Sequence, residues 1–531
     1  MAISDTIQSI YTNVENAYTS LSNKGATIPA NKNLANLADC IDSVPSGGSG
    51  GEERTVIIRD PYGSLIAEYT PEEFAALESY PQAPTLDRLT FQEYNWTLSD
   101  AKTYVANYGA LNLGAIYTPT SGLTEIDITI NKVTGYSISI AMDGTKNWGD
   151  GTSDTSNSHT YSAYGDYMIT CDGNVTYTSN NSRFFGSYNT NVIVNAIRFG
   201  TNARMIGNYG LANIPNEFSI TLSNTLIYAY QNCFMSSDVK CVIYPNSCTY
   251  LDAFVHQDNK ILEYVSLPKN ISTFGMSCFS GCSSLKNITL PLSITTVPST
   301  AFAYCYSLTK AVVPGNVITV KSSSFTNCYL LDNILLSEGI QTIEEQAFYY
   351  CYKLRNVIIP STVTSVGHRL FQQCYGLETV EFKSSNVTVG ISLFNGCNNL
   401  KSVNFSSNMS VSLDSLTRMF TDCCNLESVI IPNSIIYVED YAFYHCSKLE
   451  HITLPPTVTT ISQYAFQYMR SLKTLDMSSF TSIPSLANTS VFNNTNKALK
   501  IIVPDSLYET WIATTNWVSY ANYIYKASEV N

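Results

Sequence analysis

Cysteine is the residue type in this sequence whose spacing most clearly invites a chemical interpretation. The chain of 531 residues has 15 cysteines, and eight recur every 23 residues, with one interval of 26: Cys282, Cys305, Cys328, Cys351, Cys374, Cys397, Cys423 and Cys446. Such thiols could form disulfides, bind zinc or act as nucleophiles. No Cys-x-x-Cys pair or histidine cluster accompanies them, which disfavours zinc. A buried ladder of one small apolar thiol per repeat is the simplest interpretation, so serine at Cys351 should bury a mismatched hydroxyl and destabilise the fold.

Tyrosine recurs beside these cysteines and could contact a ligand. The chain has 37 tyrosines, and one follows the cysteine in four successive repeats. Rings stacked about 5 Å apart, each with a polar tip, suit sugar faces and protein hot spots. We therefore expect ligand binding by Tyr304, Tyr306, Tyr329, Tyr350, Tyr352 and Tyr375. Two alternatives stay open: tyrosine fills half-buried positions on the convex side, or the concave strand face is the contact surface.

Other residues that could carry catalysis are few and scattered. The five histidines lie in different repeats or segments, and no His-Glu-x-x-His, Gly-x-Ser-x-Gly or phosphate-binding glycine motif is found. Asp150 and Asp154 could bind calcium, but aspartates are equally common as turn residues. We therefore expect no enzyme activity, no cofactor and no metal site.

Charge and hydropathy exclude further classes of partner. Only 13 % of the residues are charged and the net charge is -13, whereas ordinary soluble domains have about 25 % charged residues. Phosphate binding needs clustered Lys and Arg, so we expect no nucleic acid partner. No apolar run approaches the length of about 18 residues that spans a bilayer, so we expect no membrane insertion. The first residues lack a secretory leader, which predicts synthesis in the bacterial host cytoplasm.

A 23-residue repeat must position the cysteines and tyrosines. Each ladder cysteine stands three residues after a phenylalanine and three before a leucine, as in Phe348, Cys351 and Leu354. An alternating apolar pair follows, such as Val357 and Ile359, and predicts one short strand per repeat. The segment around the phenylalanine predicts a compact turn or short helix. Since one repeat cannot bury its own apolar face, we expect the repeats to stack with parallel strands.

The same spacing continues outward in weaker form. Tyr230 with Cys233, Phe254 with Gln257, and Phe492 are interpreted as degenerate repeats. The segment IIPSTVTSVGHRLFQQCYGLETVEF (358–382) resembles the BspA-like leucine-rich repeat. This resemblance implies a curved solenoid over residues 181–504 that serves adhesion or recognition and has no catalytic residues. Residues 505–531 resemble the helical cap that ends such arrays.

The N-terminal residues predict an attachment or oligomerisation segment. Apolar residues recur in a heptad pattern over one helix, and we assign oligomerisation to Ile3, Ile7, Ile10, Val14 and Leu21. A second short helix completes residues 1–45, which resemble the N-terminal segment of bacteriophage tail and baseplate-associated proteins. We expect a homotrimer, with a two-helix hairpin docked on its own chain as the alternative. Residues 46–53 are rich in glycine and predict a linker.

Two small domains are predicted between this linker and the repeats. Residues 54–118 predict a strand hairpin, a helix capped by Thr70 with Pro71 and Glu73, and a helix from Ser99 to near Gly109. Residues 119–180 predict short strands, and the string NWGDGTSDTSNSHTYSAYGDYMIT resembles a PKD domain, which implies an Ig-like β-sandwich. The expected fold is therefore multidomain: a helical segment, a small α/β cassette, a PKD-like β domain, and a leucine-rich-repeat solenoid with a helical cap.

These features lead to three hypotheses about function, all without catalysis, and one of them is an intracellular scaffold. The first is a bacteriophage tail fibre or receptor-binding protein, located in the virion, which contacts a host cell-surface glycan or protein and other tail or baseplate proteins. The alternative is a BspA-type adhesin on a bacterial cell surface.

Overall fold

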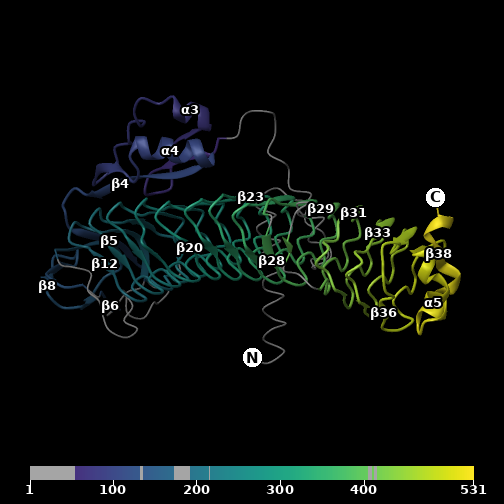
Figure 1. Ribbon diagram of the computed structural model, residues 1–531. Helices are drawn as coiled ribbons and strands as arrows, with labels where there is room; N and C mark the ends of the chain where they lie inside the picture. The colour runs from purple at the N-terminus through teal and green to yellow at the C-terminus, as the bar shows by residue number, and fades with distance from the viewer. Residues whose placement is uncertain are drawn as a thin grey trace. The chain divides into compact units, whose positions relative to one another are not determined.

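The computed structural model describes residues 54–131, 136–140, 142–172, 192–214, 216–384, 386–404, 410–411 and 415–530 (Figure 1). These residues divide into two compact units, 54–317 and 318–530, which are described separately below as unit 1 and unit 2. The predicted oligomerisation residues Ile3, Ile7, Ile10, Val14 and Leu21 and the linker 46–53 lie outside the described residues, so the homotrimer stays a prediction. No helix among the described residues combines the length and the apolar character needed to cross a membrane.

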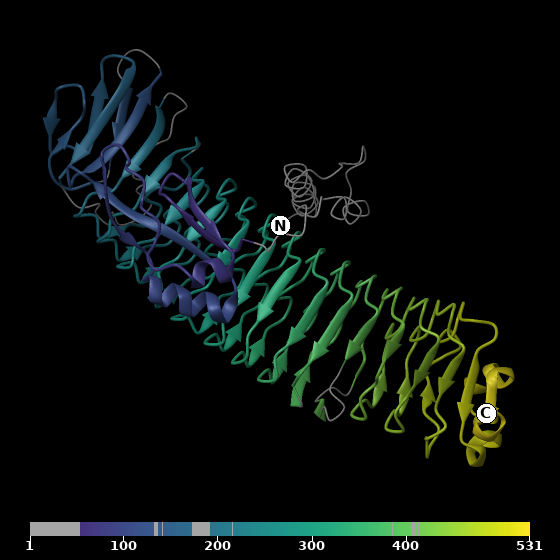
Figure 2. The same ribbon diagram turned by 90° about the horizontal axis from the view of Figure 1, so that it is seen from above.

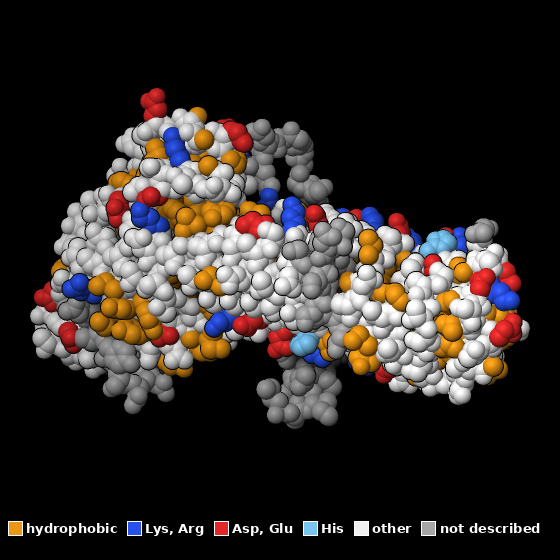
Figure 3. All heavy atoms as spheres, in the orientation of Figure 1, with side chains coloured by type: hydrophobic (Ala, Val, Ile, Leu, Met, Phe, Trp, Pro, Cys, Tyr) orange, Lys and Arg blue, Asp and Glu red, His pale blue; other side chains and the backbone are white. Residues whose placement is uncertain are grey.

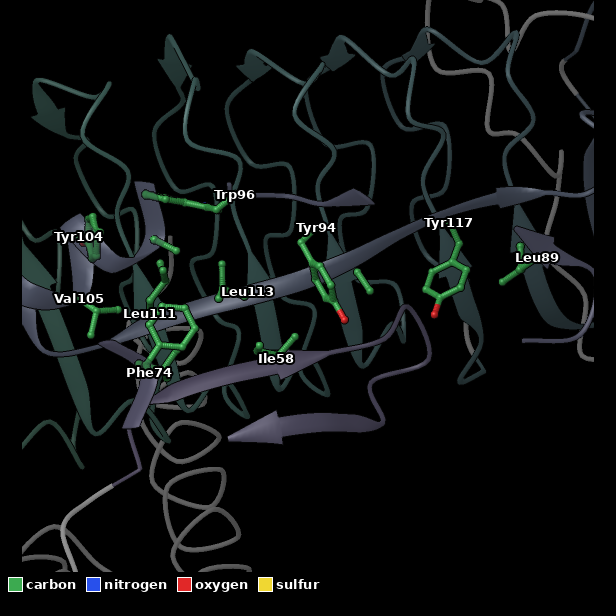
Figure 4. Packing of buried hydrophobic residues seen from close by; sticks show 13 residues of the cluster. Ile58, Phe74, Leu89, Tyr94, Trp96, Tyr104, Val105, Leu111, Leu113 and Tyr117 are labelled. Carbon is green, nitrogen blue, oxygen red and sulfur yellow. The ribbon is translucent and has the colours of Figure 1, made fainter. Parts of the chain in front are cut away.

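Unit 1 begins with the α/β cassette. Its elements are β1 (Val56–Arg59), β2 (Leu65–Tyr69), α3 (Pro71–Ala75), β3 (Leu89–Tyr94), α4 (Leu98–Tyr108) and β4 (Leu111–Pro119). The sheet order is β2-β1-β4-β3. Thr70 and Glu73 form the predicted capping box, and helix α4 ends at Gly109 in the left-handed conformation. The apolar cluster in Figure 4 includes Phe74 and Trp96 and holds the helices against β4.

The segment after the cassette contributes strands to a sheet that continues into the repeats. It contains β5 (Thr124–Ile130), β6 (Tyr136–Ser139), β7 (Lys146–Asn147), β8 (Ser153–Asp154), β9 (Ser158–Tyr161) and β10 (Gly165–Cys171). Strand β5 pairs antiparallel with β10 and with β11 (Val192–Arg198). Strand β11 pairs in parallel with β13 (Ser219–Thr221). One hydrogen-bonded ladder therefore runs from this segment into the first repeat.

Each repeat of unit 1 contributes two short strands, whereas the sequence pattern predicted one. The strands after the leucines form the main sheet: β15 (Cys241–Ile243), β17 (Tyr264–Ser266), β19 (Asn287–Thr289) and β21 (Lys310–Val313). A second sheet consists of β12 (Met205–Ile206), β14 (Tyr228–Ala229), β16 (Tyr250–Leu251) and β18 (Thr273–Phe274), and β20 (Thr296–Val297) occupies the same place in the next repeat. Neighbouring strands are parallel. The second strand was missed because a pair such as Thr273 and Phe274 is too short to show alternation.

Unit 2 repeats the same arrangement. Its main-sheet strands are β23 (Asn333–Leu336), β25 (Asn356–Ile359), β27 (Thr379–Phe382), β29 (Ser402–Asn404), β31 (Ser428–Val429), β33 (His451–Thr453), β35 (Thr474–Asp476) and β37 (Lys500–Val503). Its second-sheet strands are β22 (Thr319–Val320), β24 (Thr342–Ile343), β26 (Ser365–Val366), β28 (Asn386–Val389), β30 (Ser410–Val411), β32 (Tyr437–Val438), β34 (Thr460–Ile461) and β36 (Ser485–Leu486). The predicted stacking of 23-residue repeats with parallel strands is thus confirmed within each unit.

Stacked phenylalanines form the centre of the unit 2 core. Phe371 lies between Phe348 and Phe394, with ring centroids 5.7 and 6.0 Å away and nearly parallel planes. The cysteine of each repeat donates an S–H hydrogen bond to the carbonyl of the phenylalanine one repeat earlier, as Cys374 does to Phe348 at 3.0 Å. All described cysteines are free thiols. Each of these carbonyls also accepts from the backbone N–H of the cysteine in its own repeat, as Phe348 does from Cys351, so the thiol adds a second hydrogen bond that links neighbouring repeats.

This hydrogen bond bears on the expectation that a hydroxyl at the cysteine position would be buried without a suitable partner. In unit 1 Ser237 occupies that position and its hydroxyl donates to Leu211 O. In the last repeat of unit 2 Thr495 donates to Phe466 O at 3.0 Å. Serine therefore has a ready acceptor here, and the mismatch argument for Cys351→Ser was wrong.

The register of the first repeats also differs from the prediction. His256, not Phe254, occupies the phenylalanine position, because its ring stacks between Phe234 and Phe279 with centroids 4.8 and 5.3 Å away. Phe234 takes the place that had been given to Tyr230. The sequence pattern was aligned on phenylalanine and therefore missed His256. Its imidazole is also a flat ring, but it is a different residue type.

The buried histidine predicts acid sensitivity of unit 1. Burial lowers the pKa of His256 to about 3, below its ordinary value near 6.5, so the folded protein excludes a proton that the unfolded chain takes up. The stability that this neutral ring provides is complete above pH 6.5 and is lost as the pH falls towards 3. We expect a loss on the order of 2–3 kcal/mol between pH 7 and pH 4.5. Amide hydrogen exchange in residues 230–285 measures it, and His256→Phe should flatten the profile. An equal loss in both proteins would contradict this account.

The segment around each phenylalanine is a turn and not a short helix. Two residues per repeat have positive φ, as do Ser323 (57°) and Asn327 (58°). This geometry directs backbone N–H groups at the next repeat: Phe325 donates to Ala347 O at 2.9 Å, and Asn327 donates to Tyr349 O at 2.7 Å. A third row of hydrogen bonds between repeats results, and it accounts for the absence of helical spacing at these positions.

Residues 504–530 end the array of unit 2. Helix α5 (Tyr508–Ala513) lies between the 3-10 turns η1 (Asp505–Leu507) and η2 (Trp517–Tyr523), and β38 (Ile524–Lys526) adds in parallel to β37. Trp511 and Trp517 are buried, and the indole of Trp517 donates to Pro484 O at 2.8 Å. The final turn η3 (Ala527–Glu529) follows. These residues cover the open edge of β37, as the end of a solenoid requires.

Candidate functional site

The outward side chains of the main sheet form the candidate recognition surface, which we call the strand face. In each strand the first and third residues point outward, because the residue between them is buried in the core, as Val242 is between Cys241 and Ile243. In unit 1 the cassette occupies this face. Strand β4 runs across β15, β17 and β19, as Figures 2 and 4 show, and every residue of β4 is buried.

Hydrogen bonds from outward side chains hold β4 in place. The backbone N–H of Asn112 donates to Thr289 Oγ1 at 3.1 Å, and its carbonyl accepts from Ser266 Oγ at 2.9 Å. The Tyr264 hydroxyl donates to the carbonyl of Leu113 at 2.6 Å. The Asn112 side chain donates to Asn287 Oδ1 at 2.7 Å. The strand face of unit 1 therefore contacts both the backbone of β4 and the side chain of Asn112.

Gly114 allows this close approach. A Cβ atom at this position would overlap Cγ2 of Ile243, and two further atoms of the same side chain lie within 3 Å of it. Cys241, Ile243 and Tyr264 pack with Ile116 in a small apolar cluster. The crossing of β4 over β15 in this geometry thus requires glycine at position 114, since even the Cβ of alanine would overlap Ile243.

The strand face of unit 2 is exposed. The outward residues of four successive strands are Asn333, Leu335, Asn356, Ile358, Thr379, Glu381, Ser402 and Asn404. Leu335 is 40 % exposed and Ile358 is 50 % exposed. Amides, hydroxyls, the carboxylate of Glu381 and two large apolar side chains therefore face solvent. The space-filling view of another side of the molecule likewise shows few charges among uncharged groups (Figure 3).

A polar cleft lies beside this face in unit 1. It measures 390 Å³ and is lined by the β1–β2 hairpin and by β15 and β17. Its charged residues largely pair with one another, since Lys240 and Lys286 both contact the carboxylate of Glu263, at 3.5 and 2.5 Å. The guanidinium of Arg59 lies over the ring of Tyr264. The cleft could hold a small polar ligand, although Glu263 already pairs with both lysines.

The predicted tyrosine site is mostly buried. Tyr352 stacks between Tyr329 and Tyr375 with ring centroids 4.6 and 5.0 Å away, as expected of a ladder. However, Tyr329 and Tyr352 are only 4 % and 3 % exposed, as is Tyr306 of unit 1 at 3 %. These three rings present almost no face to a ligand.

The remaining rings of that prediction lie nearer the surface. Tyr350 and Tyr375 are half-buried, and Tyr304 is 36 % exposed. Burial raises the pKa of Tyr375 to about 12. Ligand binding by the tyrosines stays a prediction, with Tyr304, Tyr350 and Tyr375 as the rings that could still make contact.

One cluster in unit 2 contains the side-chain types of a cysteine nucleophile site. Cys424 Sγ lies 3.7 Å from Nδ1 of His445, and the Asp422 carboxylate lies 3.0 Å from the same nitrogen. A relay needs the base and the orienting carboxylate on different ring nitrogens. Burial and the charge of Asp422 also raise the pKa of Cys424, which opposes formation of the thiolate. This arrangement does not support nucleophilic catalysis.

The candidate calcium ligands of unit 1 have other partners. Asp150 accepts from the backbone of Thr152 at 3.0 Å and lies 2.7 Å from His159 Nε2. Asp154 accepts from the indole of Trp148 at 3.1 Å and from the backbone of Ser156. Among the described residues, no group of three or more His, Cys, Asp or Glu side chains could hold a metal ion. The geometry is that of turn residues, and the PKD resemblance stays a prediction.

The stacked strand, buried phenylalanine and buried leucine of each repeat define a leucine-rich-repeat protein. A family model for the BspA type leucine-rich repeat region matches residues 180–309, 295–415 and 416–512, with six copies of the repeat. These spans cover more than half of the sequence, and the chain belongs to the BspA type leucine-rich repeat family. No curated protein matches the chain.

Several solved structures are similar in part. A leucine-rich repeat protein from Bacteroides ovatus is 22 % identical and has a TM-score of 0.47; the match covers 63 % of this chain and 84 % of that one. One from Eubacterium ventriosum is 23 % identical over 51 % of this chain and 82 % of that one, with a TM-score of 0.37. A leucine-rich cell surface protein from Faecalibacterium prausnitzii is 19 % identical, with a TM-score of 0.34 and coverage of 62 % and 89 %.

Proposed function

We propose that this chain is a non-catalytic recognition protein that acts at a bacterial cell surface as a BspA-type adhesin. Its membership of the BspA type family supports adhesion or recognition as the general role. One observation carries the proposal furthest: Leu335 and Ile358 are exposed side by side in a row of amides and hydroxyls on the unit 2 strand face. Large apolar side chains with polar surroundings are typical of contact surfaces.

The thiols and the buried histidine support a role without catalysis. Burial raises the pKa of the ladder cysteines, such as Cys351 and Cys397, so they do not form reactive thiolates. His256 is fully buried and neutral between two phenylalanines. The absence of enzyme activity is accordingly part of the proposal.

A virion location is the competing form of this proposal. The resemblance of residues 1–45 to phage tail segments would place the same recognition on a tail fibre, with tail or baseplate proteins as further partners. That segment lies outside the described residues. The cell-surface form rests on the family of the repeats, and we therefore prefer it.

Adsorption to cells tests the strand face. We expect the full chain to bind epithelial or bacterial cells, and Ile358→Asp to reduce adsorption at least tenfold, because an interface that buries apolar residues cannot accept a carboxylate. Flow cytometry with labelled protein gives the measurement. Val518→Asp is the matched control, since Val518 is a 56 % exposed apolar residue in the C-terminal cap. Equal adsorption by the wild type and Ile358→Asp would refute this use of the strand face.

A further inference from the structure

Five aromatic side chains meet on the turns of two neighbouring repeats in unit 2. We call them the turn cluster: Tyr441, Tyr444, His445, Tyr464 and Tyr468. Between the repeats, Tyr441 packs on Tyr464 with ring centroids 5.0 Å apart, and Tyr444 packs edge-on against Tyr468 with centroids 5.4 Å apart. Within one repeat, Tyr441 and Tyr444 meet at 5.3 Å, and His445 lies 6.2 Å from Tyr468. The five rings therefore form one continuous surface.

The turn cluster is accessible, in contrast to the tyrosine stack around Tyr352. Its five side chains are half-buried, whereas Tyr352 is 3 % exposed. The two repeats of the cluster have Ser447 and Arg470 at the position of Tyr352, so their tyrosines lie on the turns and not in the stack. No hydrogen-bond partner for the four phenol hydroxyls is found among the described residues, and none of these oxygens is fully enclosed. Ring surface and hydroxyl groups are therefore available to a ligand.

The backbone beneath the cluster disfavours aromatic residues. Tyr441, Tyr464 and Tyr468 have positive φ angles of 60°, 59° and 62°. A bulky side chain rarely adopts this left-handed conformation, which asparagine and glycine adopt more readily. The other described repeats have at most one aromatic residue at the two equivalent positions, and in one repeat Ser323 and Asn327 hold them. The repeat does not need aromatic residues here, and strained bulky residues of this kind are typical of functional sites.

Charged side chains at the edge of the cluster add hydrogen-bonding groups of both kinds. The Asp422 side chain is 44 % exposed, and its carboxylate lies 3.0 Å from Nδ1 of His445. The guanidinium of Arg418 lies 5.5 Å from the ring centroid of Tyr441. Asp440, next to Tyr441 in the sequence, supplies a second carboxylate. Aromatic surface therefore lies beside both donors and acceptors, and the carboxylates outnumber the guanidinium.

We propose that the turn cluster binds a neutral glycan. A pyranose ring has a face of C–H groups, which packs on the phenol rings, and a rim of hydroxyls, which donate to Asp422 and accept from Arg418. The excess of carboxylates disfavours an acidic sugar. A glycan is favoured over a protein because the four phenol hydroxyls and the carboxylate call for many polar partners in a small area. The site lies on the turns, so this inference is independent of the proposed use of the strand face.

An array of neutral oligosaccharides tests the proposal. The array presents oligosaccharides of glucose, galactose, mannose and their N-acetyl derivatives, and it is probed with the labelled full chain. An oligosaccharide that binds is then titrated by calorimetry. The expected result is an affinity that Tyr464→Asn weakens at least tenfold. Because asparagine suits the positive φ at this position, the variant should melt at least as high as the wild type. A purely structural tyrosine predicts the opposite, namely a lower melting temperature with unchanged affinity.

Two further variants make the test specific. Tyr444→Ser changes a ring of the cluster whose φ is not positive, and it should also weaken binding at least tenfold. Tyr209→Asn is the matched control, because Tyr209 holds the position of Tyr464 in the first repeat of unit 1, with a φ of 56°, and should leave the affinity unchanged.

Three results would overturn the inference: no neutral oligosaccharide binds, only acidic ones bind, or neither Tyr464→Asn nor Tyr444→Ser changes the affinity. The strand-face variant Ile358→Asp should bind the oligosaccharide as the wild type does. Failure of the strand-face proposal and failure of this inference are therefore distinguishable.

Discussion

Replacing Phe371 with alanine is expected to lower the free energy of unfolding of unit 2 by roughly 3–5 kcal/mol. The ring is fully buried and stacks on Phe348 and Phe394, so its removal leaves a cavity between these two rings. The backbone cannot close the gap, because the Phe371 amide donates to Leu393 O and its carbonyl accepts from Cys397 Sγ. Chemical denaturation followed by circular dichroism measures the effect.

Phe91→Ala is the matched control for this loss. Phe91 is 38 % exposed in β3 of the cassette, so its removal creates no enclosed cavity and should cost under about 1 kcal/mol. A loss of similar size in the two variants would show that the phenylalanine stack does not stabilise the repeats.

Gly114→Val is expected to detach the cassette from the strand face of unit 1. The new side chain overlaps Ile243. The movement that relieves the overlap also breaks the hydrogen bonds that join Asn112 to Thr289 and Leu113 to Tyr264. Valine favours β-strands more than glycine does, so any destabilisation reports the clash and not strand propensity. Limited proteolysis should cleave residues 54–119 at least tenfold faster than in the wild type.

A second substitution tests the cause of this effect. Ile243→Ala removes the three atoms that the new side chain meets, so the double variant should regain most of its resistance to protease. If the double variant is cleaved as fast as Gly114→Val alone, the crossing at Ile243 does not hold the cassette.

The repeats were predictable because burial fixes residue type at fixed intervals. Phenylalanine, cysteine and leucine fill positions that are fully enclosed, so their spacing in the sequence is also the spacing of the core. The prediction failed where another side chain meets the same physical need. His256 supplies a flat ring, and Ser237 and Thr495 supply the donor that the thiols of other repeats provide.

The candidate site was harder to predict from the sequence than the repeats were. Tyrosine was expected at a binding surface because of its chemistry, yet Tyr329 and Tyr352 stack tightly enough to exclude ligands. The exposed Ile358 has the sequence appearance of a core residue within the string NVIIP. Only its place between Val357 and Ile359, the alternating apolar pair of this strand, indicated that Ile358 points outward.

The position of β4 across the main sheet could not have been predicted from the spacing of residues in the sequence. Its contacts join residues about 150–180 positions apart, such as Tyr264 with Leu113 and Thr289 with Asn112. No periodic pattern links such pairs. The segment LNLGAIY did carry one sign, since its apolar residues surround a glycine that no turn requires.

Many stabilising contacts in the repeats of unit 2 join a residue to its counterpart one repeat away. Examples are the stacking of Phe348 on Phe371, the pairing of Arg355 with Glu378, and the hydrogen bond from Thr379 to Asn356. An in-frame duplication or loss of one repeat's codons therefore restores each type of contact at the new junction. Genes for such chains can change length by unequal recombination, which would lengthen or shorten the exposed face without a new fold having to arise.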